Sequence, residues 1–441
     1  MVQATVHFPR GFLWGTATAS HQVEGNNTNN QWWQWEQEGR TLDKSGLACD
    51  WWGGRWREDM DRAAEGGQNT HRFSVEWSRI QPEPGRWDED ALERYRTMVR
   101  GMRDRGLTPL VTLHHFTDPL WLYNMCAWET DAVVPLFEKY VRKVVEALKE
   151  YVTTWCTINE PNSYVAGGYI EPFFPPAKKD HKLGIQVMAN MLRGHAAAYR
   201  AIHQIQPEAR VGYAWHYRPM LAYRPWFPLD RIAAGMAHKA LCLAFPSGIT
   251  TGVIRSPLGN ASVPEAKGTQ DFMGLNYYTM EHVAFDLRRP ADLFVRHFFP
   301  EGSDLSPNGY AANLPNGLFD SVKWATKAFP NMPIIITENG TEDPDDRFRP
   351  RYLAQHLHQL WYAVNLNWPV KAYYHWSLVD NFEWERAWSQ RFGLWELDIH
   401  TQARRKRPSA DLYAEICREN GLSTEMVAKY CPEVLQKEFP G

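Results

Sequence analysis

The chain of 441 residues lacks the sequence features of disulfide-rich, secreted and membrane-spanning proteins. Its six cysteines are scattered without C-x-x-C spacing, which predicts free, buried thiols in a reducing compartment. No apolar stretch reaches the ~18 residues that a transmembrane helix needs, so we expect no membrane partner. Residues 1–10 do not show the charged region followed by an apolar one that marks a signal peptide. Together, these absences predict a soluble, cytoplasmic protein.

The charge of the chain is too balanced for a nucleic-acid-binding protein, so we expect no nucleic-acid partner. The formal net charge is −3, and charged residues make up 22% of the sequence. The one dense basic cluster, at residues 404–407, has no basic face around it, and we interpret it as a solvated surface turn. No Gly/Ser-rich linker or fixed-period repeat divides the sequence, and 44% of the residues are hydrophobic. We therefore predict a single domain over residues 1–441.

Runs of β-forming residues alternate with helical patterns along the chain. In the helical stretches the apolar residues recur every three or four positions, which indicates βα units and a parallel sheet. We count eight β-forming runs, the strand number of the TIM barrel, so the predicted fold class is α/β, a single (β/α)8 barrel. The predicted strands are 13–19, 70–75, 108–115, 153–159, 209–215, 271–277, 333–338 and 370–376.

The connections between these strands are of two kinds. Helices are predicted at 91–105, 131–151, 184–206 and 351–367, with Gly106 and Pro207 as end signals for the first and third. Long irregular stretches follow the first, fifth and sixth strands, at 22–56, 216–230 and 279–315. Each is a βα connection, so we expect these long loops to lie over the carboxyl face of the barrel, where barrel enzymes hold their active sites.

Two glutamates stand directly after β-forming runs. Glu160 lies in the TINEP segment at 157–161, and Glu338 lies in the ITENG segment at 336–340. A single glutamate in such a place is more often a structural ion-pair partner. Two carboxylates at the carboxyl ends of barrel strands, however, would face one pocket. That pairing indicates double displacement at an acetal carbon, which needs a nucleophile and an acid that later acts as a base.

Other polar and aromatic residues stand at nearly every predicted strand end. Any one of them has a structural explanation, such as a buried ion pair, a satisfied histidine or aromatic packing, but together they would converge on one face of the barrel. The 21 tryptophans fit this picture, because indole rings offer flat apolar faces and an N–H donor to a sugar. The residues concerned are Gln22, Glu24, Arg72, His114, His115, Asn159, Asn276, Tyr278, Trp376, Glu383 and Trp384.

These segments resemble those of glycoside hydrolase family 1, the retaining β-glycosidases, and the resemblance covers nearly the whole chain. All of the family's segments occur in family order. They are 12–19 (FLWGTATA) with 22–25 (QVEG), 71–80 (HRFSVEWSRI), 112–116 (TLHHF), 157–161 (TINEP), 271–278 (DFMGLNYY), 336–340 (ITENG), 376–384 (WSLVDNFEW) and 391–394 (RFGL).

The resemblance implies a role for each matching residue. Glu160 would be the acid/base and Glu338 the nucleophile of a β-glucosidase-type enzyme. Arg72, Asn276 and Tyr278 would support the nucleophile, and a cation and a phenol donor there favour its ionised form. No cofactor and no metal enter this chemistry. The substrate-binding residues would be Gln22, His115, Asn159, Trp376 as the stacking floor, Glu383, Trp384 and Phe392.

Two residues narrow the expected substrate to a small-molecule β-glycoside without phosphate. Glu383 stands where the 6-phospho-glycosidases of the family tend to carry a small hydroxyl residue, and a carboxylate would repel a 6-phosphate. Glu160 differs from the glutamine of plant myrosinases, so leaving groups that need protonation are accessible. The sequence departs from the family at Thr117-Asp118, at 168–179 and at His216, where asparagine is common. The departures concern the aglycone side, and the choice among glucose, galactose and fucose stays open.

Three other functions are compatible with parts of the sequence. A 6-phospho-β-glycosidase is the nearest alternative on substrate. A metal hydrolase would have to use His114, His115 and Asp118 or the pair His356 and His358, but neighbouring residues of a strand point to opposite faces. A non-catalytic sugar-binding barrel would be expected to have lost one of the two glutamates. The oligomeric state cannot be inferred from the sequence.

Overall fold

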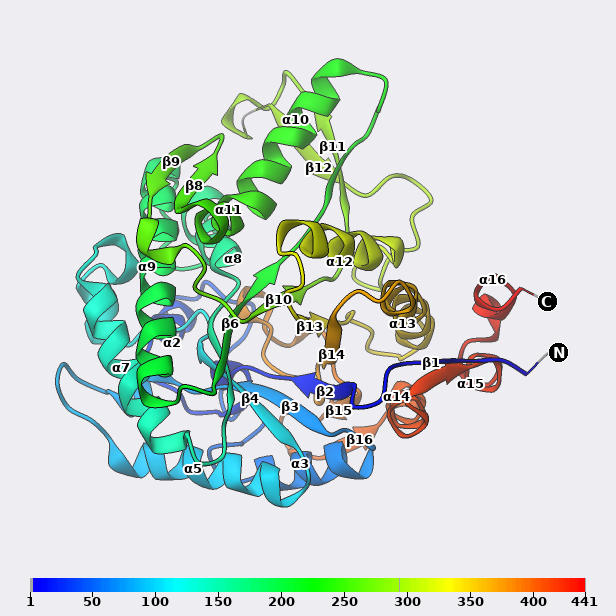
Figure 1. The fold of residues 1–441 in the computed structure, drawn as a ribbon, viewed down its shortest axis with the longest axis horizontal. Coiled ribbons are helices and arrows are strands. Elements are labelled where there is room, and N and C mark those ends of the chain that lie inside the picture. Colours follow the sequence, from blue (N-terminus) through cyan, green and yellow to red (C-terminus); the bar gives the residue numbers. More distant parts are fainter. Residues whose placement is uncertain (1–2, 293, 441) are drawn as a thin grey trace.

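In the computed structural model, which describes residues 3–292 and 294–440, eight parallel strands close into a barrel. The strands follow one another around the barrel in chain order, and the last pairs with the first (Figure 1). The predicted (β/α)8 barrel is therefore confirmed, and each predicted strand end is correct to within two residues. The barrel strands are β2 (Leu13–Ala17), β3 (Thr70–Ser74), β4 (Thr108–His114), β5 (Thr154–Asn159), β6 (Arg210–His216), β10 (Phe272–Asn276), β13 (Ile334–Asn339) and β14 (Val370–Trp376).

Helices cover the barrel, and all four predicted ones are present with ends within three residues of the prediction. They are α5 (Glu89–Asp104), α7 (Val133–Leu148), α9 (His181–Ile205) and α13 (Arg349–Asn365). Asp88 and Asp180 cap α5 and α9 by accepting hydrogen bonds from backbone N–H groups of the first turn. Gly106 follows α5 with φ +77°, a left-handed conformation that glycine adopts without strain.

The barrel has two hydrophobic layers, because successive side chains of a strand point to opposite faces. Residues such as Val211, Tyr213 and Trp215 of β6 face outward and pack in the large cluster under the helices. Inside the barrel a smaller cluster contains Ala17, Leu110, Cys156, Ala214 and Ala372. These mostly small side chains fill the lumen and leave its carboxyl end to the larger polar groups of the site.

The long connections that we predicted to be irregular contain regular elements. The first holds α2 (Gln31–Gln37), the second holds β7 (Met220–Ala222), and the third holds β11 (Glu281–Phe285) and β12 (Val295–Phe298). The three strands form a small sheet in the order β12-β11-β7, beside α10 (Pro228–His238) at the top of the view in Figure 1. These strands are too short to show a recognisable alternation of apolar and polar residues, and β7 pairs with residues about 60 positions away. The sequence therefore could not predict them.

The prediction of a solvated turn for the basic cluster at 404–407 is half right, because Arg405 and Lys406 are exposed but the segment is not a turn and its other two arginines are buried. Arg404–Lys406 forms strand β16, and the Arg404 side chain is buried against Asp59 with an N–O distance of 3.1 Å. Arg407 is buried too and pairs with Asp380 at 2.8 Å. The carboxylates that neutralise these arginines come from distant parts of the chain, so charge counting along the sequence could not find them.

The prediction for the cysteines is correct in five of six cases. All six are free thiols, and Cys126 alone is exposed.

Among the described helices, one continuous segment, Pro228–Thr251, has the length and composition of a membrane-crossing helix, with a mean hydropathy of 1.2 and 44% of the window buried. A core helix has the same properties, and Ala233, Ala234 and Phe245 of this segment are buried in hydrophobic clusters.

Candidate active site

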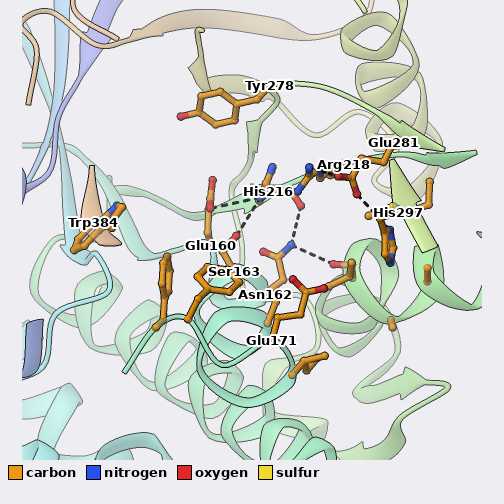
Figure 2. Close-up of a pocket in the computed structure, with 18 of the residues that line it drawn as sticks. Glu160, Asn162, Ser163, Glu171, His216, Arg218, Tyr278, Glu281, His297 and Trp384 are labelled. Carbon is orange, nitrogen blue, oxygen red and sulfur yellow. Dashed lines mark hydrogen bonds and ion pairs between the residues drawn. The ribbon is translucent and has the colours of Figure 1, made fainter. Parts of the chain in front are cut away.

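A cavity of about 640 Å³ opens at the carboxyl ends of the barrel strands. Both predicted glutamates line it, as do residues from the long connections. Figure 2 shows Glu160 among the lining side chains. A cavity of this size falls in the usual range for small-molecule sites. Of the predicted site residues, those that line it are His115, Asn159, Glu160, Tyr278, Glu338, Trp376, Glu383, Trp384 and Phe392.

Glu338 lies near the end of β13 and is 3% exposed. Its two carboxyl oxygens accept hydrogen bonds from different donors. Arg72 Nη1, from β3, donates to Oε1 at 2.5 Å, and the Tyr278 hydroxyl donates to Oε2 at 2.6 Å. Because the guanidinium can only donate, this arrangement favours an ionised carboxylate with its charge held in a fixed direction.

Opposing influences set the pKa of Glu338. The pKa of this carboxyl is raised to about 7, mainly by burial and in part by the negative charge of the nearby Glu160. The charge of Arg72 and the hydrogen bonds from Tyr278 and Arg72 act in the opposite direction and limit the rise. Arg72 and Tyr278 both act in favour of the carboxylate, but desolvation is the larger effect. The carboxyl therefore titrates close to neutral pH.

Glu160 occupies a strained position between β5 and the short helix α8 (Pro161–Val165). Its φ and ψ of 42° and 59° are left-handed, which costs a non-glycine residue about 1–3 kcal/mol. The following Pro161 disfavours the ordinary helical conformation at Glu160, and the Glu160 backbone N–H donates to the Ala214 carbonyl at 2.8 Å. The turn directs the side chain into the cavity, where Asn276 Nδ2 donates to its Oε1 at 2.6 Å.

The pKa of Glu160 is raised, as an acid that keeps its proton at neutral pH requires. Burial is the main cause of the rise. Hydrogen bonds from Asn276 and Ser163 and the charge of Arg72 act in the opposite direction. The two glutamates thus sit in one buried pocket with different partners, which is the condition for assigning them different chemical roles.

A chain of side-chain amides connects the two glutamates and fixes their orientation. Asn159 Oδ1 accepts from Arg72 Nη2 at 2.7 Å and from Asn276 Nδ2 at 3.1 Å. Its Nδ2 must then be the group that faces His115 Nε2 at 3.0 Å. The acceptor at Nε2 places the imidazole proton of His115 on Nδ1. Burial lowers the pKa of His115 well below its ordinary value, so this ring is neutral.

The far end of the cavity has the composition of a sugar-binding pocket. Trp376 ends β14 and donates its indole N–H to Glu383 Oε1 at 2.9 Å. The ring of His115 stacks at 6.0 Å from the rings of both Trp376 and Trp384. Burial raises the pKa of Glu383 to about 8, and the Trp376 hydrogen bond lowers it. Aromatic faces beside an acceptor pair match the alternating C–H and O–H faces of a sugar ring.

Two buried polar atoms at this end have no hydrogen-bond partner in the described part of the chain. They are Gln22 Oε1 and His115 Nδ1. The amide nitrogen of Gln22 is held by Asn381 Oδ1 at 2.9 Å and by the Phe382 carbonyl at 2.7 Å, which fixes the free oxygen in place. An unpaired buried polar group is costly, so a hydroxylated ligand that pairs with both atoms would bind favourably.

Some residues singled out in the sequence lie elsewhere. Glu24 forms an ion pair with Arg79 at 2.7 Å. His114 turns away from the cavity and lies 3.0 Å from Asp118, whereas its neighbour His115 faces the cavity, so the two histidines cannot share one ion. His356 and His358 also diverge, the first toward Asn339 and the second toward Glu438. No group of three or more His, Cys, Asp or Glu side chains suited to a metal occurs within the described ranges.

The outer half of the cavity contains residues that sequence reasoning missed. Arg218 forms an ion pair with Glu281 of β11, and His297 Nδ1 lies 3.3 Å from Glu281 Oε2 (Figure 2). Only His216 gave a signal, as a departure from the family pattern. The others lie on short strands, in loops or in the helix after a motif, without spacing that marks them. The missed residues are Ser163, Arg218, Glu281, His297 and Tyr310.

An apolar wall also lines the cavity. Two π-helical turns contribute to it, η2 (Ala166–Ile170) and η3 (Lys239–Leu243), and such turns are frequent at functional sites. The apolar side chains of the wall are Ile170, Met236, Leu241 and Leu258. The outer cavity therefore offers one polar and one apolar side to a leaving group.

The barrel and its site define the class of protein, a glycoside hydrolase with two buried glutamates in one sugar-sized cavity. The sequence profile of Glycosyl hydrolase family 1 matches residues 4–245 and 255–422. The chain belongs to glycosyl hydrolase family 1 and is a β-glycosidase.

Known proteins of this family are similar to the chain over nearly its full length. It is 30% identical to β-glucosidase A of Thermotoga maritima, over 94% of this chain and 98% of the relative. It is 28% identical to the human cytosolic β-glucosidase, over 95% of this chain and the whole of the relative. A solved β-glycosidase from Pyrococcus horikoshii superposes with a TM-score of 0.90 at 36% identity, covering 97% of this chain and 98% of that one.

Proposed function

We propose that this protein is an exo-acting β-glycosidase that hydrolyses non-phosphorylated β-glycosides by double displacement, with Glu338 as nucleophile and Glu160 as acid/base. The observation that carries the proposal is the unequal surroundings of the two glutamates. Glu338 accepts hydrogen bonds on both oxygens, one of them from a guanidinium, whereas the short bond to Glu160 comes from the neutral amide of Asn276 and reaches Oε1. The first arrangement suits a carboxylate, and the second leaves an oxygen that can carry a proton.

In the first step Glu338 attacks the anomeric carbon. The C–O bond to the aglycone breaks while Glu160 gives its proton to the leaving oxygen, and a covalent glycosyl-enzyme forms. Arg72 and Tyr278 keep the attacking carboxylate oriented, since they contact it from two sides. In the second step Glu160, now a carboxylate, takes a proton from water as the water displaces Glu338, so the configuration is retained. Retention requires the two carboxyl groups to be roughly 5–5.5 Å apart.

The aromatic and polar groups beside the two glutamates support exo-action on a terminal sugar. Trp376 would stack on the ring, and Glu383 would accept from two neighbouring hydroxyls. Gln22 Oε1 and His115 Nδ1, both buried without partners among the described residues, would bind further hydroxyls. Related proteins carry the names β-glucosidase and β-galactosidase, and one from Thermotoga maritima was solved in complex with glucoimidazole. These names support a β-glucoside substrate with some tolerance at the sugar.

Two experiments test this proposal. Incubation with a 2-deoxy-2-fluoro-β-glucoside of a good leaving group should trap the covalent intermediate, and peptide mass spectrometry should place the label on Glu338. A label on any other residue would refute the assignment. The second experiment compares kcat/KM for nitrophenyl β-glucoside and its 6-phosphate. We expect a preference for the free sugar, because Glu383 offers a phosphate no cation and becomes a like charge as the pH rises through its pKa of about 8. A preference for the phosphate would identify a 6-phospho-β-glycosidase.

A further inference from the structure

The two oxygens of Glu160 meet different partners. Oε1 accepts from the amide of Asn276 at 2.6 Å, and an amide nitrogen can only donate. A proton on Oε1 would break this bond, so the acidic proton belongs on Oε2. That oxygen faces the imidazole of His216 at the end of β6, with Nδ1 at 3.7 Å (Figure 2).

Ser163 lies between the proton-carrying side of Glu160 and His216. Its hydroxyl is 3.1 Å from His216 Nδ1, and it also lowers the pKa of the Glu160 carboxyl by hydrogen bonding. Ser163 and His216 are both held in place through their backbones. Ser163 lies in α8, the helix that begins directly after Glu160, and Asn162 Nδ2 of the same helix donates to the His216 carbonyl at 2.8 Å. The hydroxyl can rotate about its C–O bond, so two acceptors compete for one donor.

His216 is neutral in this position. Burial and, to a lesser extent, the charge of Arg218 lower its pKa to about 4, against the opposing effects of Glu338 and Glu281. A neutral imidazole that carries its proton on Nε2 accepts at Nδ1 and adds no charge beside Glu160. The other charged or titratable groups near the pair are Arg72, Tyr278 and Tyr310. None of these groups changes in the variants described below.

We infer that Ser163 and His216 form a positioning pair that follows the protonation state of Glu160. When Glu160 carries its proton, the Ser163 hydroxyl donates to His216 Nδ1 and leaves Oε2–H free for the leaving oxygen. After the proton has been given to the leaving group, the hydroxyl turns and donates to the Glu160 carboxylate. The pair thus stabilises the charged form when it arises, without moving a proton itself. This inference rests on the proposed role of Glu160 as acid/base.

The pair predicts opposite shifts for its two members in the alkaline limb of the pH profile, the limb that reports loss of the acid's proton. Ser163→Ala removes a donor to the carboxylate, so the alkaline limb should move to higher pH, by up to about one unit. His216→Phe keeps the site buried but removes the competing acceptor. The hydroxyl then donates only to Glu160, and the limb should move to lower pH.

The test is the pH dependence of kcat/KM for a β-glucoside with a poor leaving group, in the full-length enzyme. The double variant of Ser163→Ala and His216→Phe should behave like Ser163→Ala alone, because His216 acts through the hydroxyl. Ser163→Thr should restore the wild-type limb. Ser321→Ala is the matched control, since Ser321 is a buried helical serine that donates to the Gly317 carbonyl and does not line the cavity. It should leave the profile unchanged.

The outcomes separate this inference from the proposed function. With dinitrophenyl β-glucoside, which needs little acid assistance, the alkaline limb of the wild type should disappear; if it persists unchanged, Glu160 is not the acid. If it disappears but the two single variants shift the limb in the same direction, or not at all, the acid assignment stands and the Ser163–His216 pair is refuted. A double variant that differs from Ser163→Ala would refute the coupling.

Discussion

Removal of the Tyr278 hydroxyl is a clean perturbation of the proposed nucleophile. Tyr278→Phe deletes one hydrogen bond, from the phenol to Glu338 Oε2 at 2.6 Å, and leaves the ring in place beside Phe392. A hydrogen bond to a charged group contributes about 1.5–3 kcal/mol, which corresponds to about one to two pKa units. The bond favours the carboxylate, so its loss should raise the pKa of Glu338 from about 7 toward roughly 8 or 9.

This shift has a defined effect on activity. The nucleophile must be ionised, and its ionised fraction at pH 7 should fall by about five- to fifty-fold when its pKa rises by one to two units. In the pH profile of kcat/KM for nitrophenyl β-glucoside, the acid limb should move to higher pH while the alkaline limb stays in place. Tyr140→Phe is the control, since that buried hydroxyl donates to the Leu113 carbonyl at 3.0 Å. An acid limb that does not move, or moves to lower pH, would refute the argument.

Three further predictions concern the acid, the sugar and the aglycone. Glu160→Ala should reduce kcat/KM for unactivated disaccharides by about 10²–10⁴-fold and spare activated aryl glycosides much more; equal loss on both would indicate a structural role. Glu383→Ser should lower kcat/KM for the free glucoside by roughly ten- to a hundredfold or more, because the sugar hydroxyls lose an acceptor at a cost of about 1–3 kcal/mol. The same change should narrow the preference over the 6-phosphate, because it removes a carboxyl group that is negatively charged above its pKa of about 8. An unchanged ratio would show that Glu383 does not face the sugar. The kcat/KM for octyl β-glucoside should exceed that for methyl β-glucoside by tenfold or more, since each CH₂ buried against the wall of Met236 and Leu241 contributes about 0.8 kcal/mol. Equal kcat/KM values would show that the octyl group stays in water.

The barrel itself could be predicted because its signals are local. The predicted strand 370–376 coincides with β14 (Val370–Trp376), and Gly106 follows α5 in the left-handed conformation that a helix end favours. Both signals depend on a few neighbouring residues, on strand alternation in one case and on glycine's freedom at positive φ in the other. The two glutamates could be placed at one face for the same reason, as each follows a strand of a parallel barrel.

The remaining features depend on residues far apart in the chain. β7 and β11 pair although about 60 residues separate them, and Arg404 is buried only because Asp59 neutralises it. The pKa of Glu338 also depends on distant residues. Its burial cannot be inferred from its neighbours in the sequence, and burial affects the pKa more than Arg72 and Tyr278 do. Desolvation is a property of the assembled pocket, so the sequence could indicate the partners of this carboxyl but not its titration.

The most direct test of the central claim is the configuration of the product that Glu338→Ala forms with azide. This variant lacks the nucleophile but keeps the acid and the pocket, so hydrolysis should fall nearly to zero. With an activated β-glucoside, azide should enter from the side that Glu338 leaves empty and give an α-glucosyl azide, which NMR identifies by its anomeric proton. Recovery of the β-azide, or hydrolysis at the wild-type rate without azide, would contradict the account.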